Sequence, residues 1–142
     1  MIVVDTTVLV YAVGDEHPLR EPSVRLLTAI GDGRLEATTT VEVIQEFAHA
    51  RARRGKRADA ASLARDFAQT LSPLLVVDHD TLDRGLTLFA QSQLGAFDAV
   101  LAAAALTHEA DAVVSADQAF ASVPRLNHVV PGTAEFERLL AV

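Results

Sequence analysis

The chain has 142 residues, 50% of them hydrophobic, and a formal net charge of −7. This is the size of one ordinary domain, so we expect residues 1–142 to form a single domain. The negative charge argues against binding nucleic acid through bulk electrostatics alone, and the absence of cysteine excludes disulfide scaffolds and cysteine-based zinc sites.

The apolar pattern predicts strands that alternate with helices. A β-branched run at residues 1–4 indicates a buried strand that ends at Asp5. Further strands are expected at residues 36–38, 73–77, 112–115 and 127–130. Helices are expected at residues 7–13, 21–30, 41–53, 59–71, 81–91, 98–108 and 134–140. At the turn before the helix at 81–91, Asp80 is the expected cap.

This alternation is typical of the α/β class, with a central, mainly parallel sheet of four to five strands and helices on both faces. In such folds the ligand site lies beyond the carboxyl ends of the strands. Asp5 and Asp117 each closely follow the end of an expected strand. Both are therefore candidates for a functional site at that edge of the sheet.

Nothing in the sequence indicates a membrane segment or a signal peptide. The longest strongly apolar run, Ala99–Leu106, is far shorter than the roughly 20 residues that span a bilayer. The first ten residues contain no lysine or arginine, so they lack the charged start of a signal peptide. We expect a cytoplasmic protein.

Asp5 and Asp117 also have a purely structural interpretation. Asp5 precedes Thr6, Thr7 and an apolar run, which is good N-capping chemistry, and a cap or turn role suits Asp117 equally. In the functional interpretation, the two threonine hydroxyls lie near Asp5. Ser115 places a further hydroxyl before Asp117, where it can hold a metal-bound water or a ligand. The local sequence leaves both interpretations open.

The helix expected at residues 41–53 carries two glutamates with different surroundings. Thr39 and Glu42 have the spacing of a capping box, which would give Glu42 a structural task. Glu46 lies instead at the border of the apolar face, where a carboxylate can face a cleft against a neighbouring element. We therefore favour Glu46 over Glu42 for function. The alternative for Glu46 is a solvated surface acid.

Asp98 precedes the run at residues 99–106, which is apolar on every side and predicts a buried helix. An ordinary N-cap is one interpretation of this acid. However, a charged group that enters a buried helix has to be paired, capped or bound to metal. Asp98 is therefore a further site candidate.

Basic residues are concentrated in one short segment, which contains Arg51, Arg53, Arg54, Lys56 and Arg57. Cations suit the C-terminal end of a helix, so a polar helix end is the plain interpretation. The alternative is contact with RNA through the first three arginines. The five histidines are scattered, with no pair at zinc-ligand spacing.

Taken together, the acidic segments resemble the four motifs of PIN-domain nucleases. The segments are IVVDTTVLVYAV, TTTVEVIQEFAHAR, LGAFDAVLAAAAL and AVVSADQAF. Their residue patterns are most similar to those of the VapC toxins of type II toxin–antitoxin modules, and the resemblance runs from residue 1 to about residue 130. It aligns the family's four acids with Asp5, Glu46, Asp98 and Asp117, and its hydroxyl position with Ser115.

The resemblance implies a PIN-like fold and a toxic Mg²⁺-dependent endoribonuclease that hydrolyses RNA phosphodiester bonds. Mg²⁺, or alternatively Mn²⁺, suits carboxylates because both are hard cations that take oxygen ligands. We expect Asp5 and Asp98 to be the principal metal ligands and Glu46 and Asp117 to complete the catalytic site. Thr7 and Ser115 are secondary site candidates.

The resemblance also implies a homodimer and a VapB-type antitoxin with which the chain forms a larger complex. The helical stretches at residues 21–30 and 63–71 are candidates for the antitoxin groove. Two alternatives remain, namely a non-toxin PIN nuclease of RNA processing and a non-catalytic α/β signalling or binding domain. A phospho-acceptor receiver needs a lysine near its last strand, whereas the only lysine here is Lys56.

Overall fold

The computed structural model describes residues 1–142, and its centre is a four-stranded sheet. The strand order is β2-β1-β3-β4, and every neighbouring pair is parallel. The strands are β1 (Ile2–Val4), β2 (Ala37–Thr38), β3 (Ala112–Val114) and β4 (His128–Val129). The α/β class with a parallel sheet, expected from the alternation of apolar patterns, is confirmed.

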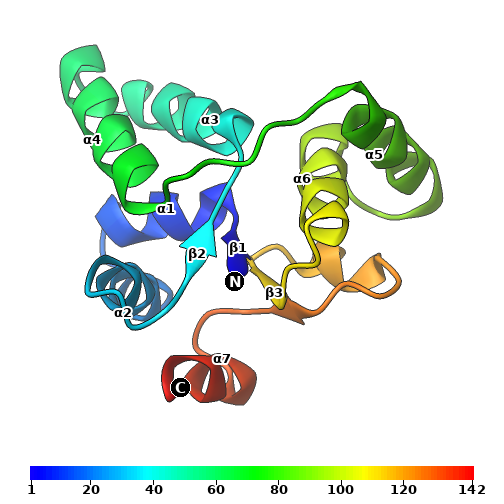
Figure 1. The fold of residues 1–142 in the computed structure, drawn as a ribbon. Coiled ribbons are helices and arrows are strands. Elements are labelled where there is room, and N and C mark those ends of the chain that lie inside the picture. The colour runs from blue at the N-terminus through cyan, green and yellow to red at the C-terminus, as the bar shows by residue number, and fades with distance from the viewer.

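Helices cover this sheet on both sides. They are α1 (Thr6–Val13), α2 (Arg20–Gly31), α3 (Val41–Ala52), α4 (Arg57–Thr70), α5 (His79–Gln91), α6 (Ala96–Thr107), the 3-10 helix η1 (Gln118–Ser122) and α7 (Ala134–Leu140). Figure 1 shows α1 and α2 on one side of the strands and α5 and α6 on the other. None of the helices is both long and apolar enough to cross a membrane.

The direction in which successive strands are added to the sheet reverses between β1 and β3. From β1 the chain passes through α1 and α2 to β2 at one edge, whereas β3 continues to β4 at the other edge. Such a switch point opens a crevice at the carboxyl ends of the strands. Asp5 follows β1 and Ser115 follows β3, and the Asp5 amide donates to the Val114 carbonyl at 3.0 Å. Both side chains therefore lie at the mouth of this crevice.

The core is built from the strands and from the small side chains of α6. Every residue of β1 and β3 is buried, as expected for parallel strands covered on both faces. Helix α5 approaches α6 closely at Gly85, where an added Cβ would lie 2.8 Å from the Cα of Val100. This contact has no room for a larger side chain.

The strand expected at residues 73–77 is wrong. The segment makes only an isolated bridge, between Leu75 and Thr40, and Val76 is 73% exposed. Two hydrogen bonds tie it to the sheet side of the molecule, one from the Leu75 amide to the Thr39 carbonyl at 2.9 Å and one from the Thr38 hydroxyl to the Pro73 carbonyl at 2.8 Å. An apolar composition without a partner strand along its length does not make a strand.

The cap expected at Asp80 is also wrong. Helix α5 begins at His79, and Asp78 is its N-cap. The Asp78 carboxylate accepts a hydrogen bond from the Thr81 amide at 2.8 Å, which is the usual N-cap contact three residues along the chain. Because residues 76 and 77 do not extend a strand, the helix starts two residues earlier than the pattern predicts.

Candidate active site

Asp5 is a buried carboxylate at the start of α1, with 2% of its surface exposed. It is the N-cap of that helix, and its Oδ2 accepts from the Thr7 amide at 3.4 Å and from the Thr7 hydroxyl at 2.8 Å. The same oxygen accepts from the Ser115 hydroxyl at 2.6 Å. The capping interpretation is thus confirmed, and Oδ1 is left for a further partner.

Hydroxyl groups connect Asp5 to the turn that carries Asp117. The buried Ser115 Oγ accepts from the Asp117 amide at 3.0 Å, and the Thr7 Oγ1 accepts from the Ala116 amide at 3.0 Å. Asp117 itself is exposed and caps η1 by accepting from the Ala119 amide at 2.9 Å. These bonds fix the start of α1 and the end of β3 relative to each other.

Glu46 reaches the same place from α3. Its Oε2 accepts a hydrogen bond from the Thr6 hydroxyl at 3.0 Å, which joins α3 to the first residue of α1. The side chain is exposed, so it borders open space and not the core. Glu46 therefore faces the neighbouring helix, as its position at the edge of the apolar face predicts.

The capping box expected at Thr39 is wrong by one residue. Thr40 is the N-cap of α3, and its hydroxyl accepts from the Val43 amide at 3.3 Å. The Thr39 hydroxyl instead donates to the Val4 carbonyl at 2.6 Å. The Glu42 carboxylate does not return to the cap, and its buried Oε2 has no hydrogen-bond partner.

Asp98 lies in the first turn of α6 and is not its N-cap, which is Gly95. The pKa of the half-buried Asp98 carboxyl is raised from 3.8 to about 7. Burial is the largest cause, followed by the negative charges of Asp5, Glu46 and Asp117 and by a hydrogen bond with Asp117. Asp5, Glu46 and Asp117 are therefore close enough to Asp98 for their charges to raise its pKa.

One open cavity of about 390 Å³ contains all four acids. Its lining residues are Asp5, Thr6, Thr7, Val10, Tyr11, Glu46, Ala50, Asp98 and Asp117. They come from α1, α3, α6 and the turn before η1, which are far apart in the chain. The sequence candidates Asp5, Glu46, Asp98, Asp117 and Thr7 thus share one cavity, and Ser115 lies behind Asp5.

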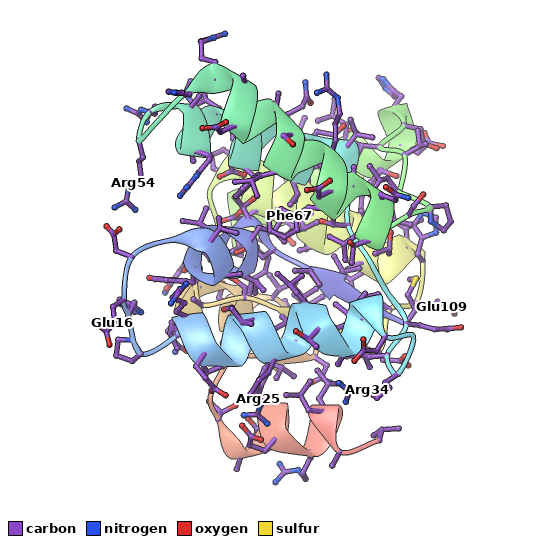
Figure 2. The ribbon with its side chains drawn as sticks, turned by 90° about the vertical axis from the view of Figure 1, so that its left-hand side faces the viewer. Glu16, Arg25, Arg34, Arg54, Phe67 and Glu109 are labelled. Atoms are coloured by element: carbon purple, nitrogen blue, oxygen red, sulfur yellow. The ribbon has the colours of Figure 1, made fainter.

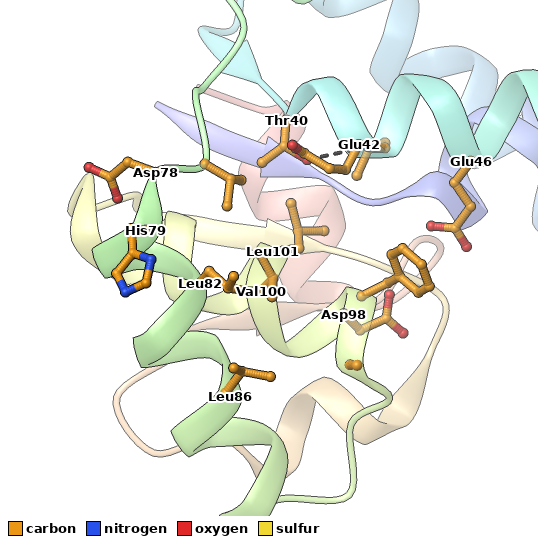
Figure 3. A pocket seen from close by; sticks show the side chains of 14 residues that line it. Thr40, Glu42, Glu46, Asp78, His79, Leu82, Leu86, Asp98, Val100 and Leu101 are labelled. Carbon is orange, nitrogen blue, oxygen red and sulfur yellow. Dashed lines mark hydrogen bonds between the residues drawn. The ribbon is translucent and has the colours of Figure 1, made fainter.

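A second, mostly apolar cavity of about 380 Å³ adjoins the first and shares Glu46 and Asp98 with it. It lies between α3, α5 and α6. Figure 3 shows these two carboxylates at one end of the groove and Asp78 and His79 at the other. The acidic cavity therefore opens on one side onto an apolar groove.

The donor chemistry of the acidic cavity suits a hard divalent cation. Carboxylate and hydroxyl oxygens are the ligands that such ions take in proteins. A bound cation would also offset the negative charge that raises the pKa of Asp98. No three acidic or histidine side chains are arranged as a ready metal site. The cation would consequently keep several waters, as Mg²⁺ commonly does.

Two of the three arginines considered for RNA contact have partners within the protein. The Arg51 guanidinium donates to the Val13 carbonyl at 3.0 Å, and Arg54 pairs with Asp15 at 2.5 Å. Figure 2 shows Arg54 at the end of the molecule where the loop after α1 lies. Arg53 is exposed and forms no ion pair. An RNA contact by these arginines stays a prediction.

Tyr11 belongs to the cavity but was not singled out by its sequence. Tyr11 follows Thr7 by four residues and therefore lies on the same face of α1. That spacing is the one signal that places it beside the acids. Thr6 was expected near Asp5, but its contact with Glu46 was not, because that contact depends on how α3 packs on α1.

Known proteins similar to this chain share its length and its fold. A family model described as "PIN domain" matches residues 2–126. Ribonuclease VapC7 from Mycobacterium tuberculosis is 53% identical over 145 residues, which cover 99% of this chain and 98% of that protein.

Two solved structures match the fold at lower sequence identity. VapBC2 from Rickettsia felis, bound to a DNA fragment from its promoter, has a TM-score of 0.68 and 21% identity over 92% of this chain and 99% of the other. FitAcB from Neisseria gonorrhoeae has a TM-score of 0.69 and 18% identity over 90% and 96%.

Proposed function

This chain belongs to the PIN-domain family of VapC ribonucleases, and from that premise we propose that its four-acid cavity hydrolyses RNA phosphodiester bonds with bound Mg²⁺. The enzyme class follows from the ribonuclease that is 53% identical over nearly the whole chain. The observation that supports the site is the convergence of Asp5, Glu46, Asp98 and Asp117 on one cavity. The alternative of a non-catalytic signalling domain is wrong.

The carboxylates differ in what they contribute. Asp5 is held by Ser115 and Thr7 through Oδ2 alone, so its Oδ1 is available to a cation. Asp98 has to give up its proton, since its pKa is about 7 without a cation. We assign these two as the principal metal ligands, and Glu46 and Asp117 as groups that complete the site directly or through water.

Mg²⁺ held by these residues would supply an activated water and would screen the charge that grows on the phosphate and on the leaving oxygen. The side chains of the chain itself position that chemistry. The Ser115 hydroxyl orients Asp5 and also holds the backbone of Asp117. The Thr6 hydroxyl orients the carboxylate of Glu46 toward α1. Asp5, Glu46 and the backbone of Asp117 are thereby held in place before RNA arrives.

We further propose that the chain is the toxin of a type II module, with a VapB-type antitoxin and a homodimer as its assembly. Its relationship to VapC7 and its fold similarity to VapBC2 and FitAcB support this assignment over a non-toxin PIN nuclease. A binding groove for the antitoxin at α2 and α4, and a cytoplasmic location, stay predictions.

The test is cleavage of a structured RNA by the purified protein with Mg²⁺ or with EDTA. We expect EDTA to abolish cleavage, and Asp5→Asn and Asp98→Asn to slow it by roughly 100-fold or more, as for lost metal ligation. Glu42→Gln is the matched control on α3, because Glu42 lies outside the acidic cavity. If both aspartate variants cut as fast as the parent, the proposed site is wrong.

A further inference from the structure

One side of the acidic cavity is aromatic, and the roles proposed for the four acids do not involve it. Tyr11 lines the cavity and is the only aromatic residue to do so. Its ring stacks on the ring of His17, with 4.4 Å between the centroids and 29° between the planes. Tyr11 is half-buried and His17 is exposed. The tyrosine therefore lies between the cavity and a supporting imidazole.

The loop that carries His17 is anchored at several points. The His17 Nδ1 accepts a hydrogen bond from the Leu19 amide at 3.1 Å. This nitrogen therefore carries no proton, and the neutral ring holds its proton on Nε2. Arg51 and Arg54 tie the same loop to the end of α3 through Val13 and Asp15. These bonds hold the imidazole against the tyrosine before any ligand binds.

We propose that Tyr11, supported by His17, stacks on the base of an unpaired nucleotide next to the scissile phosphate. Tyr11 thereby acts as a specificity residue that favours single-stranded RNA. The inference rests on the proposed function. Four carboxylates repel a phosphodiester backbone, so affinity for RNA has to come partly from uncharged contacts. Stacking on an aromatic ring supplies such a contact for any base.

The position of Tyr11 suits this role. At 1.5 Å per residue, it lies about 9 Å along the axis of α1 from Asp5. A nucleotide whose phosphate is held at the acids can therefore bring its own or a neighbouring base to the ring. In a duplex the bases are already paired and stacked, so only a loop, bulge or free strand offers one.

Kinetics on a short single-stranded RNA with a mapped cleavage position test the proposal. We expect Tyr11→Leu to lower kcat/KM by about 5- to 150-fold, the range for loss of one base–aromatic stack. Tyr11→Phe keeps the ring and should stay within about twofold of the parent, since stacking needs no hydroxyl. His17→Ala, a change at an exposed residue, should cause a smaller loss in the same direction.

The same RNA without the base beside the cleaved phosphate separates stacking from a structural role. On that abasic substrate Tyr11→Leu should cut as fast as the parent, because neither protein has a base to stack. An equal loss on both substrates, or no loss on either, overturns the proposal. A parent that cuts no RNA with Mg²⁺ would instead refute the proposed function itself.

Tyrosine fluorescence gives a second measurement, because Tyr11 is the only tyrosine and the chain has no tryptophan. In Asp98→Asn protein, used to prevent cleavage, the single-stranded RNA should quench this emission, after correction against free tyrosine. An RNA of the same length with abasic ribose at every position should not. Equal quenching by the two oligomers contradicts stacking.

Discussion

The hydroxyl of Ser115 donates a 2.6 Å hydrogen bond to Oδ2 of Asp5, across 110 residues of sequence. Ser115 is fully buried and Asp5 nearly so, so water cannot replace this bond. The same Oγ accepts from the Asp117 amide at 3.0 Å. One hydroxyl therefore sets the position of two of the four acids.

Ser115→Ala should reduce both stability and activity. Loss of a hydrogen bond to a buried carboxylate is expected to lower the free energy of unfolding by about 1–3 kcal/mol. Misplacement of Asp5 should lower kcat by about 10- to 100-fold. Urea unfolding and RNA cleavage measure the two effects. Ser23→Ala is the control, because Ser23 is equally buried and its hydroxyl bonds only to the carbonyl of Leu19, the N-cap residue of α2. It should lose stability without loss of kcat.

Asp98→Asn should change how stability depends on pH in EDTA. The folded pKa of Asp98 is about 7 and its ordinary value is 3.8, so between these values the unfolded chain releases its proton first. The parent should therefore lose stability as pH rises from about 4 to about 7, and level off above that. Asn cannot ionise, so the variant's melting temperature should exceed the parent's by more at pH 8 than at pH 4.

Asp66→Asn, at an exposed acid on α4, controls for the loss of one negative charge. It should leave the pH dependence as in the parent. In the parent, Mg²⁺ should recover stability at pH 8, because a cation favours the ionised carboxyl. RNA cleavage should rise with pH as Asp98 ionises and should flatten near or below pH 7. A parent whose stability does not fall over this range would contradict the raised pKa.

Arg53→Ala should weaken RNA binding at every sequence. Arg53 follows Ala50, a residue of the acidic cavity, by one helical turn and forms no ion pair. The slope of log affinity against log salt should fall by about 1, as for one lost phosphate contact. Arg138→Ala removes the same charge from α7, which lies away from α3 in Figure 1, and should leave the slope unchanged. Equal slopes for the parent, Arg53→Ala and Arg138→Ala would exclude a phosphate contact by Arg53.

Gly85→Ala should destabilise the protein although alanine favours helices. The new Cβ would lie 2.8 Å from both the Cα and the Cγ2 of Val100, and overpacking of this kind costs about 1–3 kcal/mol. This exceeds the gain of roughly 1 kcal/mol from helix propensity. Gly31→Ala, with nothing within 4 Å of its Cβ, should instead stabilise the protein slightly. Thermal unfolding of the two variants compares the effects.

Local pattern was sufficient for most of the fold. Helix α7 spans the predicted residues 134–140, and α3 ends within one residue of its predicted end. Pattern failed at residues 73–77, where apolar residues have no partner strand. It failed again at Thr39, whose hydroxyl bonds to the carbonyl of Val4, 35 residues away. A contact between residues so far apart in the sequence cannot be predicted from the pattern of neighbouring residues.

The site, like the fold, could be predicted only in part from the sequence. The order of the four acids along the chain, read through the family resemblance, indicated residues that share one cavity. Taken alone, the three aspartates were equally consistent with a helix cap, and Asp5 and Asp117 do cap α1 and η1. Capping and site formation are therefore not alternatives here. The role proposed for Tyr11 depends on the loop after α1, which places the His17 ring on the Tyr11 ring. Helical spacing does not predict this contact.

The central place of β1 in the sheet has a consequence for biosynthesis. This strand leaves the ribosome well before its neighbour β3 and before Ser115 and Asp117, which follow β3. Until then Asp5 lacks the hydroxyl that orients it, and the proposed cavity lacks its fourth acid. A growing chain that has not yet reached Asp117 thus lacks the complete proposed site with which to attack the RNA of the ribosome that makes it.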